Sequence, residues 1–190
     1  MSGAPVDVVV KVGGSLLAHP HYVVSVLQTL DEAARAVRLL IVPGGGRFAD
    51  AVRDVDRQFG LSPDAAHWMA ILAMDQYGYF LASRLRTGSI VHDAADIAAA
   101  YRERAVPVLA PSRWLRETDP LPHSWDVTSD SIAAWVAGTV GAPRVVLVKP
   151  PGAGSDAVDA YFHHALPAEI SRATIVAADQ TDMLRRCLTV

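Results

Sequence analysis

The two lysines of this chain are the residues with the most distinctive chemistry. Of the 17 basic residues, 15 are arginine and only Lys11 and Lys149 are lysine. A compact ammonium group has donor geometry and a shiftable pKa that a planar guanidinium does not provide. Each lysine ends an apolar run and is followed shortly by glycine or proline. We therefore expect at least one of them to be catalytic.

Two glycine-rich turns follow apolar runs. They contain Gly13, Gly14 and Ser15 in the first turn, and Gly44, Gly45 and Gly46 in the second. Such turns can bring bare backbone N–H groups up to an anion, and a helix that starts after the second adds positive potential. The spacing matches neither a P-loop nor a dinucleotide fingerprint. The turns predict a phosphate site, with an ordinary turn and a flexible loop as the alternatives.

Two further segments carry candidate site residues. In the stretch HSWDVTSD, Ser129 is expected to cap a following helix, and Asp130 at the helix start could hold a lysine in position. Thr128 belongs to the same stretch, and Lys149 leads into a tight turn that includes Gly152. The seven histidines show no H-x-x-x-H pairing, so we expect no metal site built from them.

Hydrophobic periodicity predicts strands that alternate with helices along the chain. We expect strands at 6–12, 39–42, 90–91, 106–110, 145–148 and 174–177, and helices at 22–36, 48–59, 64–84, 94–104, 129–140 and 181–188. Residues 112–127 have the character of an irregular active-site loop. The alternation predicts a three-layer α/β/α sandwich with a mostly parallel sheet, whose ligands bind outside the carboxyl ends of the strands.

Composition and length indicate a single domain over 1–190. Hydrophobic residues make up 51% of the chain, as suits a sheet covered on both faces, and the net charge of -3 argues against nucleic-acid and membrane-surface partners. No apolar run approaches a membrane span, and no signal peptide is evident. The single cysteine, Cys187, fits a reducing cytoplasm, which is the location we expect.

Four motifs in order resemble the amino acid kinase superfamily over about residues 6–150. They are KVGGSLL, VPGGGRFAD, VTSDSIAAWVA and VVLVKP. Within the superfamily, HSWDVTSDS, AHWMAILAMDQYGY and the short length are most similar to the kinases of methanofuran biosynthesis. The resemblance implies phosphorylation of 5-(aminomethyl)-3-furanmethanol phosphate to its diphosphate, with ATP and Mg²⁺, by a homodimer or higher homo-oligomer.

The resemblance also implies residue roles. Lys11 would stabilise charge on the transferred phosphoryl group, and Asp130 would orient the Lys11 side chain. Lys149 and Gly152 would lie near the nucleotide. The first glycine turn would hold the nucleotide phosphates, while the second, with Thr128 and Ser129, would hold the acceptor. Because Asp75 shares a helical face with His67, it could pair with the substrate ammonium, or it could be a surface or interface carboxylate.

Other functions remain open at this point. A uridylate or isopentenyl phosphate kinase would use the same motifs. From Lys149 onward this chain reads KPPGAGSDAVDAY, where members of the family it resembles commonly have a turn of the TDVDGVY kind. This shorter segment keeps open a non-catalytic protein of the same fold that binds a nucleotide or an oxyanion.

Overall fold

Short buried strands alternate with helices throughout the computed structural model, which describes residues 5–154, 157–170 and 172–189. Six strands pair in parallel in the order β3-β4-β2-β1-β5-β6. Their bounds are β1 (Val8–Val12), β2 (Leu39–Pro43), β3 (Gly88–Val91), β4 (Val106–Leu109), β5 (Arg144–Lys149) and β6 (Arg172–Ala177). The predicted parallel α/β sheet is confirmed, and all six strands fall where the hydrophobic runs predicted them.

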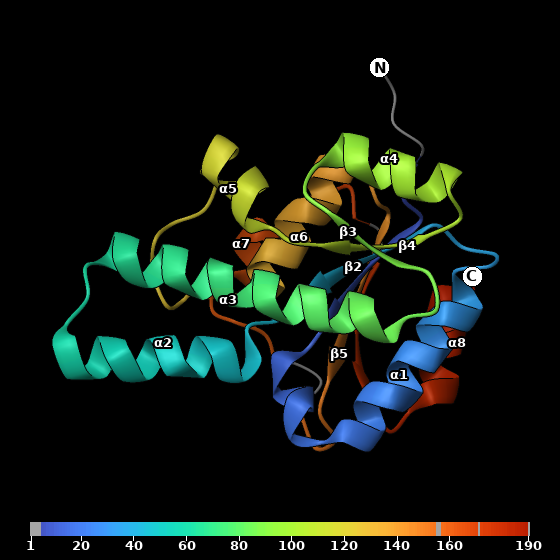
Figure 1. The fold of residues 1–190 in the computed structure, drawn as a ribbon. Coiled ribbons are helices and arrows are strands. Elements are labelled where there is room, and N and C mark those ends of the chain that lie inside the picture. Colours follow the sequence, from blue (N-terminus) through green and yellow to red (C-terminus); the bar gives the residue numbers. More distant parts are fainter. Residues whose placement is uncertain (1–4, 155–156, 171, 190) are drawn as a thin grey trace.

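Helices connect the strands and cover both faces of the sheet (Figure 1). They are η1 (Gly14–Ala18), α1 (Pro20–Ala33), α2 (Gly46–Phe59), α3 (Pro63–Arg84), α4 (Ala94–Arg102), α5 (Ser112–Thr118), α6 (Ser129–Val140), α7 (Phe162–Ala165) and α8 (Thr181–Leu188). The core on one face joins α4, α5, α6 and α7, whereas the core on the other joins α1 and α8. Both cores include side chains of α3.

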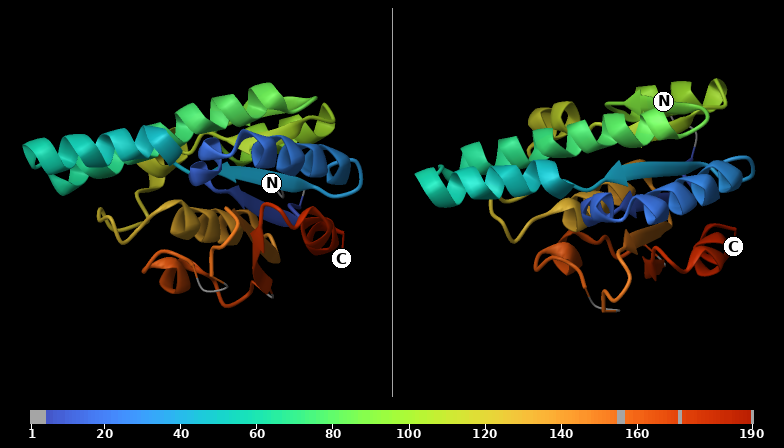
Figure 2. Two further views of the ribbon diagram at one scale, coloured as in Figure 1. Left: turned by 90° about the horizontal axis from the view of Figure 1, so that it is seen from below. Right: turned by 60° about the horizontal axis from the view of Figure 1, so that its bottom comes forward.

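The first and second halves of α3 have different surroundings. Its second half packs on the sheet, where Tyr77 and Leu81 are fully buried. Its first half extends together with α2 beyond the carboxyl ends of the strands, as Figure 2 shows. The helix begins as expected, with Pro63 in the first turn and the Ser62 hydroxyl accepting a hydrogen bond from Ala65 N at 3.2 Å.

Three local features differ from the sequence expectations. Residues 112–118 form α5 rather than an irregular loop, because Trp114 and Leu115 bury one helical face. The short helices η1 and α7 were not predicted, since each contributes little apolar periodicity.

None of the helices within the described ranges has the length and hydrophobicity that a membrane crossing requires.

Candidate active site

Strand alternation directs both lysine side chains to the same face of the sheet. On β1, Val9 packs in the core that includes α6, and Lys11 lies two residues further along. On β5, Leu147 packs in the same core, and Lys149 again lies two residues further along. Because β1 and β5 are neighbours in the sheet, the two ammonium groups converge on the start of α6.

Asp130 lies between the two lysines. Lys11 Nζ is 2.9 Å from Asp130 Oδ1, and Lys149 Nζ donates a hydrogen bond to Asp130 Oδ2 at 2.5 Å. The contact with Lys11 is an ion pair without the alignment of a hydrogen bond, so Oδ1 has no aligned donor among the described residues. The juxtaposition of Asp130 and Lys11 that the sequence suggested is therefore present in the fold.

Burial makes this trio electrostatically unusual. Lys11 is 5% exposed and Asp130 is 3% exposed. Burial lowers the pKa of Lys11, and neighbouring Lys149 lowers it further, while the Asp130 charge opposes both. Burial alone would raise the pKa of Asp130, but the two ammonium groups outweigh it and the pKa is lowered. Two cations around one carboxylate leave an excess of positive charge, which favours an anion nearby.

The two glycine turns lie in direct backbone contact. A Cβ on Gly14 would be 2.0 Å from Gly46 N, and a Cβ on Gly44 would be 2.5 Å from Gly14 N. Gly46 also has a φ of 55°, which side chains rarely adopt. The two turns therefore border one cleft. Glycine is required at these three positions because any side chain would collide with the backbone of the opposite turn.

Only some of the expected N–H groups remain available to an anion. Gly13 N donates to Val148 O at 2.9 Å, and Gly44 N donates to Val12 O at 2.9 Å, so both continue the strand ladder and cannot bind phosphate. Four other N–H groups have no hydrogen-bond acceptor among the described residues. They belong to Gly14, Ser15, Gly45 and Gly46. Free N–H groups beside a lysine fit the oxygens of a phosphate.

A cavity of about 460 Å³ opens from these turns. Its inner end is lined by Lys11 and by the glycine turns, including Gly14 and Gly46, and Thr128 and Ser129 lie on its wall. Apolar side chains of α3 form another part of the wall, among them Ile71 and Met74. The cavity is thus cationic and rich in donors at one end and apolar along its length.

The outer end of the cavity carries polar groups on an aromatic wall. Trp125 Nε1 donates to Asp56 Oδ2 at 2.8 Å, and Asp56 Oδ1 accepts a hydrogen bond from Leu61 N at 3.0 Å. The Arg53 guanidinium lies 4.8 Å from the centre of the Trp125 ring. Asp56 was not singled out from the sequence, where it is one of several acidic residues on a polar helix.

The structure does not bring Asp75 into the cavity. Its neighbour Met74 lines the cavity. Successive side chains of an α-helix are about 100° apart around the helix axis, so Asp75 points away from the cavity. Asp75 Oδ1 instead accepts a hydrogen bond from Ser112 N at 3.1 Å, at the start of α5. Burial raises the pKa of Asp75, and the hydrogen bonds from Ser112 oppose this shift. Gly152, with a φ of 84°, also lies outside the cavity lining.

Asp159 is a site residue that the sequence did not reveal. Its Oδ2 accepts hydrogen bonds from Thr128 N at 3.0 Å, Thr128 Oγ1 at 2.7 Å and Ser131 N at 3.0 Å. The N-cap position of α6 is Thr128 rather than Ser129, and the carboxylate that caps it comes from the segment after Lys149. Capping from a distant segment leaves no local sequence signal. This contact fixes the helix start that carries Asp130.

Comparison with known proteins places this arrangement in a family. The model of the amino acid kinase family matches residues 8–150, which contain both lysines and both glycine turns. The chain belongs to the amino acid kinase family. A similar protein of Methanocaldococcus jannaschii, named [5-(aminomethyl)furan-3-yl]methyl phosphate kinase, is 30% identical over 141 residues, which cover 73% of this chain and 63% of that protein. The chain thus matches under two thirds of that relative's length.

Two solved kinase structures share the fold. Uridylate kinase from Archaeoglobus fulgidus superposes with a TM-score of 0.72 at 13% identity, over 96% of this chain and 95% of that one. UMP kinase from Bacillus anthracis gives a TM-score of 0.64 at 14% identity, over 98% of this chain and 94% of that one. At these identities the likeness establishes the amino acid kinase fold and no substrate.

Proposed function

We propose that this protein is an ATP-dependent kinase that phosphorylates 5-(aminomethyl)-3-furanmethanol phosphate to its diphosphate. The observation that supports the chemistry is the buried Lys11–Asp130–Lys149 trio, of which Lys11 lines the cavity beside the free N–H groups of the glycine turns. Family membership and the name of the relative from Methanocaldococcus jannaschii support this choice of reaction and acceptor.

Phosphoryl transfer depends on alignment and on charge stabilisation more than on covalent chemistry by the protein. Lys11 would stabilise the charge that develops on the transferred group, and Asp130 would hold its ammonium in place. The N–H groups of Gly14 and Gly46 would bind phosphate oxygens from the two sides of the cleft. Mg²⁺ bound to ATP would neutralise phosphate charge and keep most of its own waters.

The rest of the cavity suits a small ring that carries a cation. Ile71 and Met74 would contact the furan ring. Since Asp75 faces α5, we propose Asp56 as the carboxylate that binds the aminomethyl ammonium. The ring would then span the cavity between the phosphate end and the Trp125 wall.

The test is Lys11→Ala, assayed by ADP release with the furan phosphate. We expect turnover to fall by about 10²–10³-fold, the usual effect of losing one positive donor at such a site. Lys11→Arg is the matched variant and should stay impaired, because a guanidinium does not reproduce the compact ammonium. Circular dichroism should show that both variants are folded.

The same assay separates the alternatives. Wild-type turnover in Lys11→Ala would refute the catalytic role of Lys11. A clear preference for UMP or isopentenyl phosphate would replace the furan acceptor by another phosphate. Tight ATP binding without turnover on any acceptor would indicate a non-catalytic nucleotide-binding protein.

We also propose a cytoplasmic location and self-association. Cys187 is a buried free thiol, in keeping with a reducing compartment. The outer face of α3 exposes Met69, Leu72 and Tyr79, which are 36%, 43% and 58% exposed. Their spacing puts these side chains on one stripe of the helix, as at a helix-to-helix contact between two copies.

A further inference from the structure

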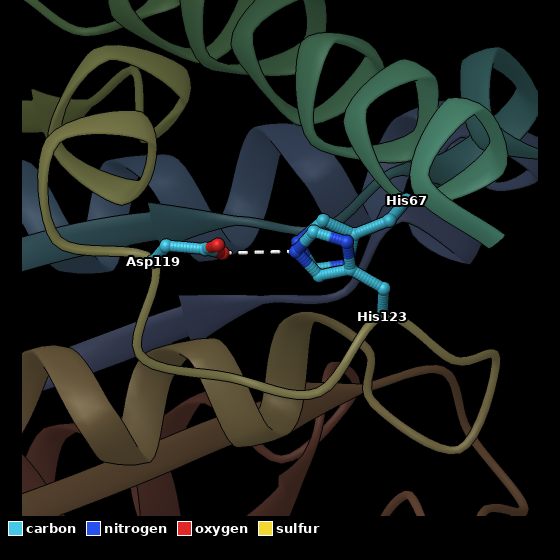
Figure 3. Close-up of side chains that lie close together, drawn as sticks. All are labelled: His67, Asp119 and His123. Carbon is cyan, nitrogen blue, oxygen red and sulfur yellow. Dashed lines mark hydrogen bonds and ion pairs between the residues drawn. The ribbon is translucent and has the colours of Figure 1, made fainter.

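Two histidines and an aspartate form a second polar cluster at the outer end of the cavity. His67 comes from α3, Asp119 ends α5, and His123 lies in the loop that leads to α6. One potential ligand atom from each residue lies within 4.8 Å of the other two. Figure 3 shows the two imidazole rings one behind the other, with a dashed line from the Asp119 carboxylate to the His123 ring.

His123 faces a carboxylate oxygen at each ring nitrogen. Nδ1 is 2.7 Å from Asp64 Oδ1, and Nε2 is 2.8 Å from Asp119 Oδ1. A neutral imidazole has one N–H, so it can donate to only one of these carboxylates. The other nitrogen must either carry a second proton or share a cation with its carboxylate, because a lone pair facing a carboxylate is repulsive.

His67 provides a second imidazole without a competing partner. Its ring stacks on that of His123, with centroids 3.9 Å apart and planes inclined by 17°. No hydrogen bond joins the His67 ring to any residue of the described segments. An uncharged imidazole can offer a ring-nitrogen lone pair to a metal ion, and one potential ligand atom of His67 lies within 4.8 Å of those of His123 and Asp119.

We propose that His67, His123 Nε2 and the Asp119 carboxylate bind a divalent transition-metal ion of the Zn²⁺ class. Two imidazoles and a carboxylate are a ligand set that Zn²⁺ accepts, with a fourth position left for water. With the metal on Nε2, His123 Nδ1 would donate its N–H to Asp64, which would orient that ring as a carboxylate does behind a metal-bound histidine. The charges of Asp64 and Asp119 balance those of the ion.

The site would join α3 to the loop between α5 and α6. His67 and His123 both line the cavity, and the same loop carries Trp125 on to the start of α6. A bound metal would therefore fix the acceptor end of the cavity. The site lies on residues other than the Lys11–Asp130–Lys149 trio and does not depend on the proposed reaction.

The test is calorimetric titration of chelator-treated full-length protein with Zn²⁺, with Mg²⁺ in excess. We expect one Zn²⁺ per chain, and Co²⁺ in its place should give visible absorption bands of a low-coordinate site. His67→Gln and Asp119→Asn each remove a direct ligand and should weaken Zn²⁺ binding by at least about 10–100-fold, the usual effect of losing an outer-shell partner alone. The control is a double variant, His163→Gln with His164→Gln, which removes the adjacent histidines of α7 and should bind as wild type.

Three outcomes would overturn the site. The first is the absence of stoichiometric Zn²⁺ binding. The second is unchanged affinity in His67→Gln, and the third is loss of binding in the α7 control. Nitrogen NMR that shows both His123 nitrogens protonated in the presence of Zn²⁺ would assign the cluster to a charged imidazole between two carboxylates instead.

Discussion

Asp130 is the residue that holds both lysines of the proposed active site in place. It is buried, it contacts both lysines of the chain, and it lies in the first turn of α6. Removing one partner of a buried ion pair is costly, because the other charges stay desolvated. We therefore expect its role to appear in stability as well as in activity.

Asp130→Asn should lower the free energy of unfolding by about 3–5 kcal/mol at neutral pH. The pKa of Asp130 is lowered in the folded state, so its contribution to stability is fully present above the unfolded pKa of about 3.9 and is lost as the pH falls from there through the lower folded pKa. The difference in the free energy of unfolding between wild type and Asp130→Asn should thus become smaller at acid pH. Urea unfolding followed by circular dichroism across this pH range measures it.

Asp54→Asn is the matched control, since Asp54 pairs with Arg57 on an exposed face of α2. Its effect should stay within about 0.5 kcal/mol. A gap between wild type and Asp130→Asn that remained constant down to the lowest pH would contradict the assigned ionisation.

Asp56 provides a test of how the acceptor is recognised. Asp56→Asn keeps the size of the side chain but removes the charge that would bind an ammonium. We expect KM for the aminomethyl substrate to rise about tenfold or more, because hydrogen bonds to charged groups contribute about 1.5–3 kcal/mol. An acceptor with a hydroxymethyl group in place of the aminomethyl group should show a much smaller change.

The comparison between the two acceptors controls for damage to the wall, since the amide of the Asp56→Asn variant has one oxygen and cannot accept from both Trp125 and Leu61 as the carboxylate does. Equal changes for both acceptors would mean that Asp56 only positions Trp125.

At the scale of elements, the interlocked turns form the floor of the cavity. Their separation is set by contact between backbone atoms, so they have no space for a methyl group. The α6 start is fixed independently, by Asp159 from the segment that follows Lys149. That segment thus caps the helix that carries Asp130.

Gly14→Ala should separate the turns, because its Cβ would lie 2.0 Å from Gly46 N. We expect ATP affinity, measured by calorimetry, to fall at least about tenfold, a loss of roughly 1.4 kcal/mol. Gly60→Ala makes the same change at the end of α2, where a Cβ meets nothing within 4 Å. That control has a φ of 64°, so it should lose about 1–2 kcal/mol of stability but keep ATP affinity. Normal ATP binding by Gly14→Ala would show that the cleft does not hold phosphate.

At the scale of the whole molecule, α2 and the first half of α3 project from the sheet (Figure 2). They form one wall of the cavity, so their outer surface is close to the acceptor site. The exposed apolar stripe on α3 is the surface through which we expect two copies to associate.

Light scattering should give the mass of a dimer or a larger assembly at micromolar concentration. Leu72→Glu should shift the protein toward the monomer, because it puts a charge into an apolar contact. Asp182→Asn on α8, at an exposed position, should leave the assembly unchanged. A wild-type protein that stays monomeric at every concentration would contradict this surface.

The strands, the parallel α/β class, the two glycine turns and the places of the two lysines at the ends of apolar runs can all be predicted from the amino-acid sequence. These features follow from local causes: alternating burial along a strand, turn chemistry, and the contrast between lysine and arginine. The packed fold was needed to show that Asp130 contacts both lysines, that Gly13 and Gly44 use their N–H groups in the sheet, and that Asp75 faces α5. It also brought Asp159 to α6 and His67 to His123. These contacts join segments far apart in the chain, and the packing of helices on the sheet determines them, which no short stretch of sequence encodes.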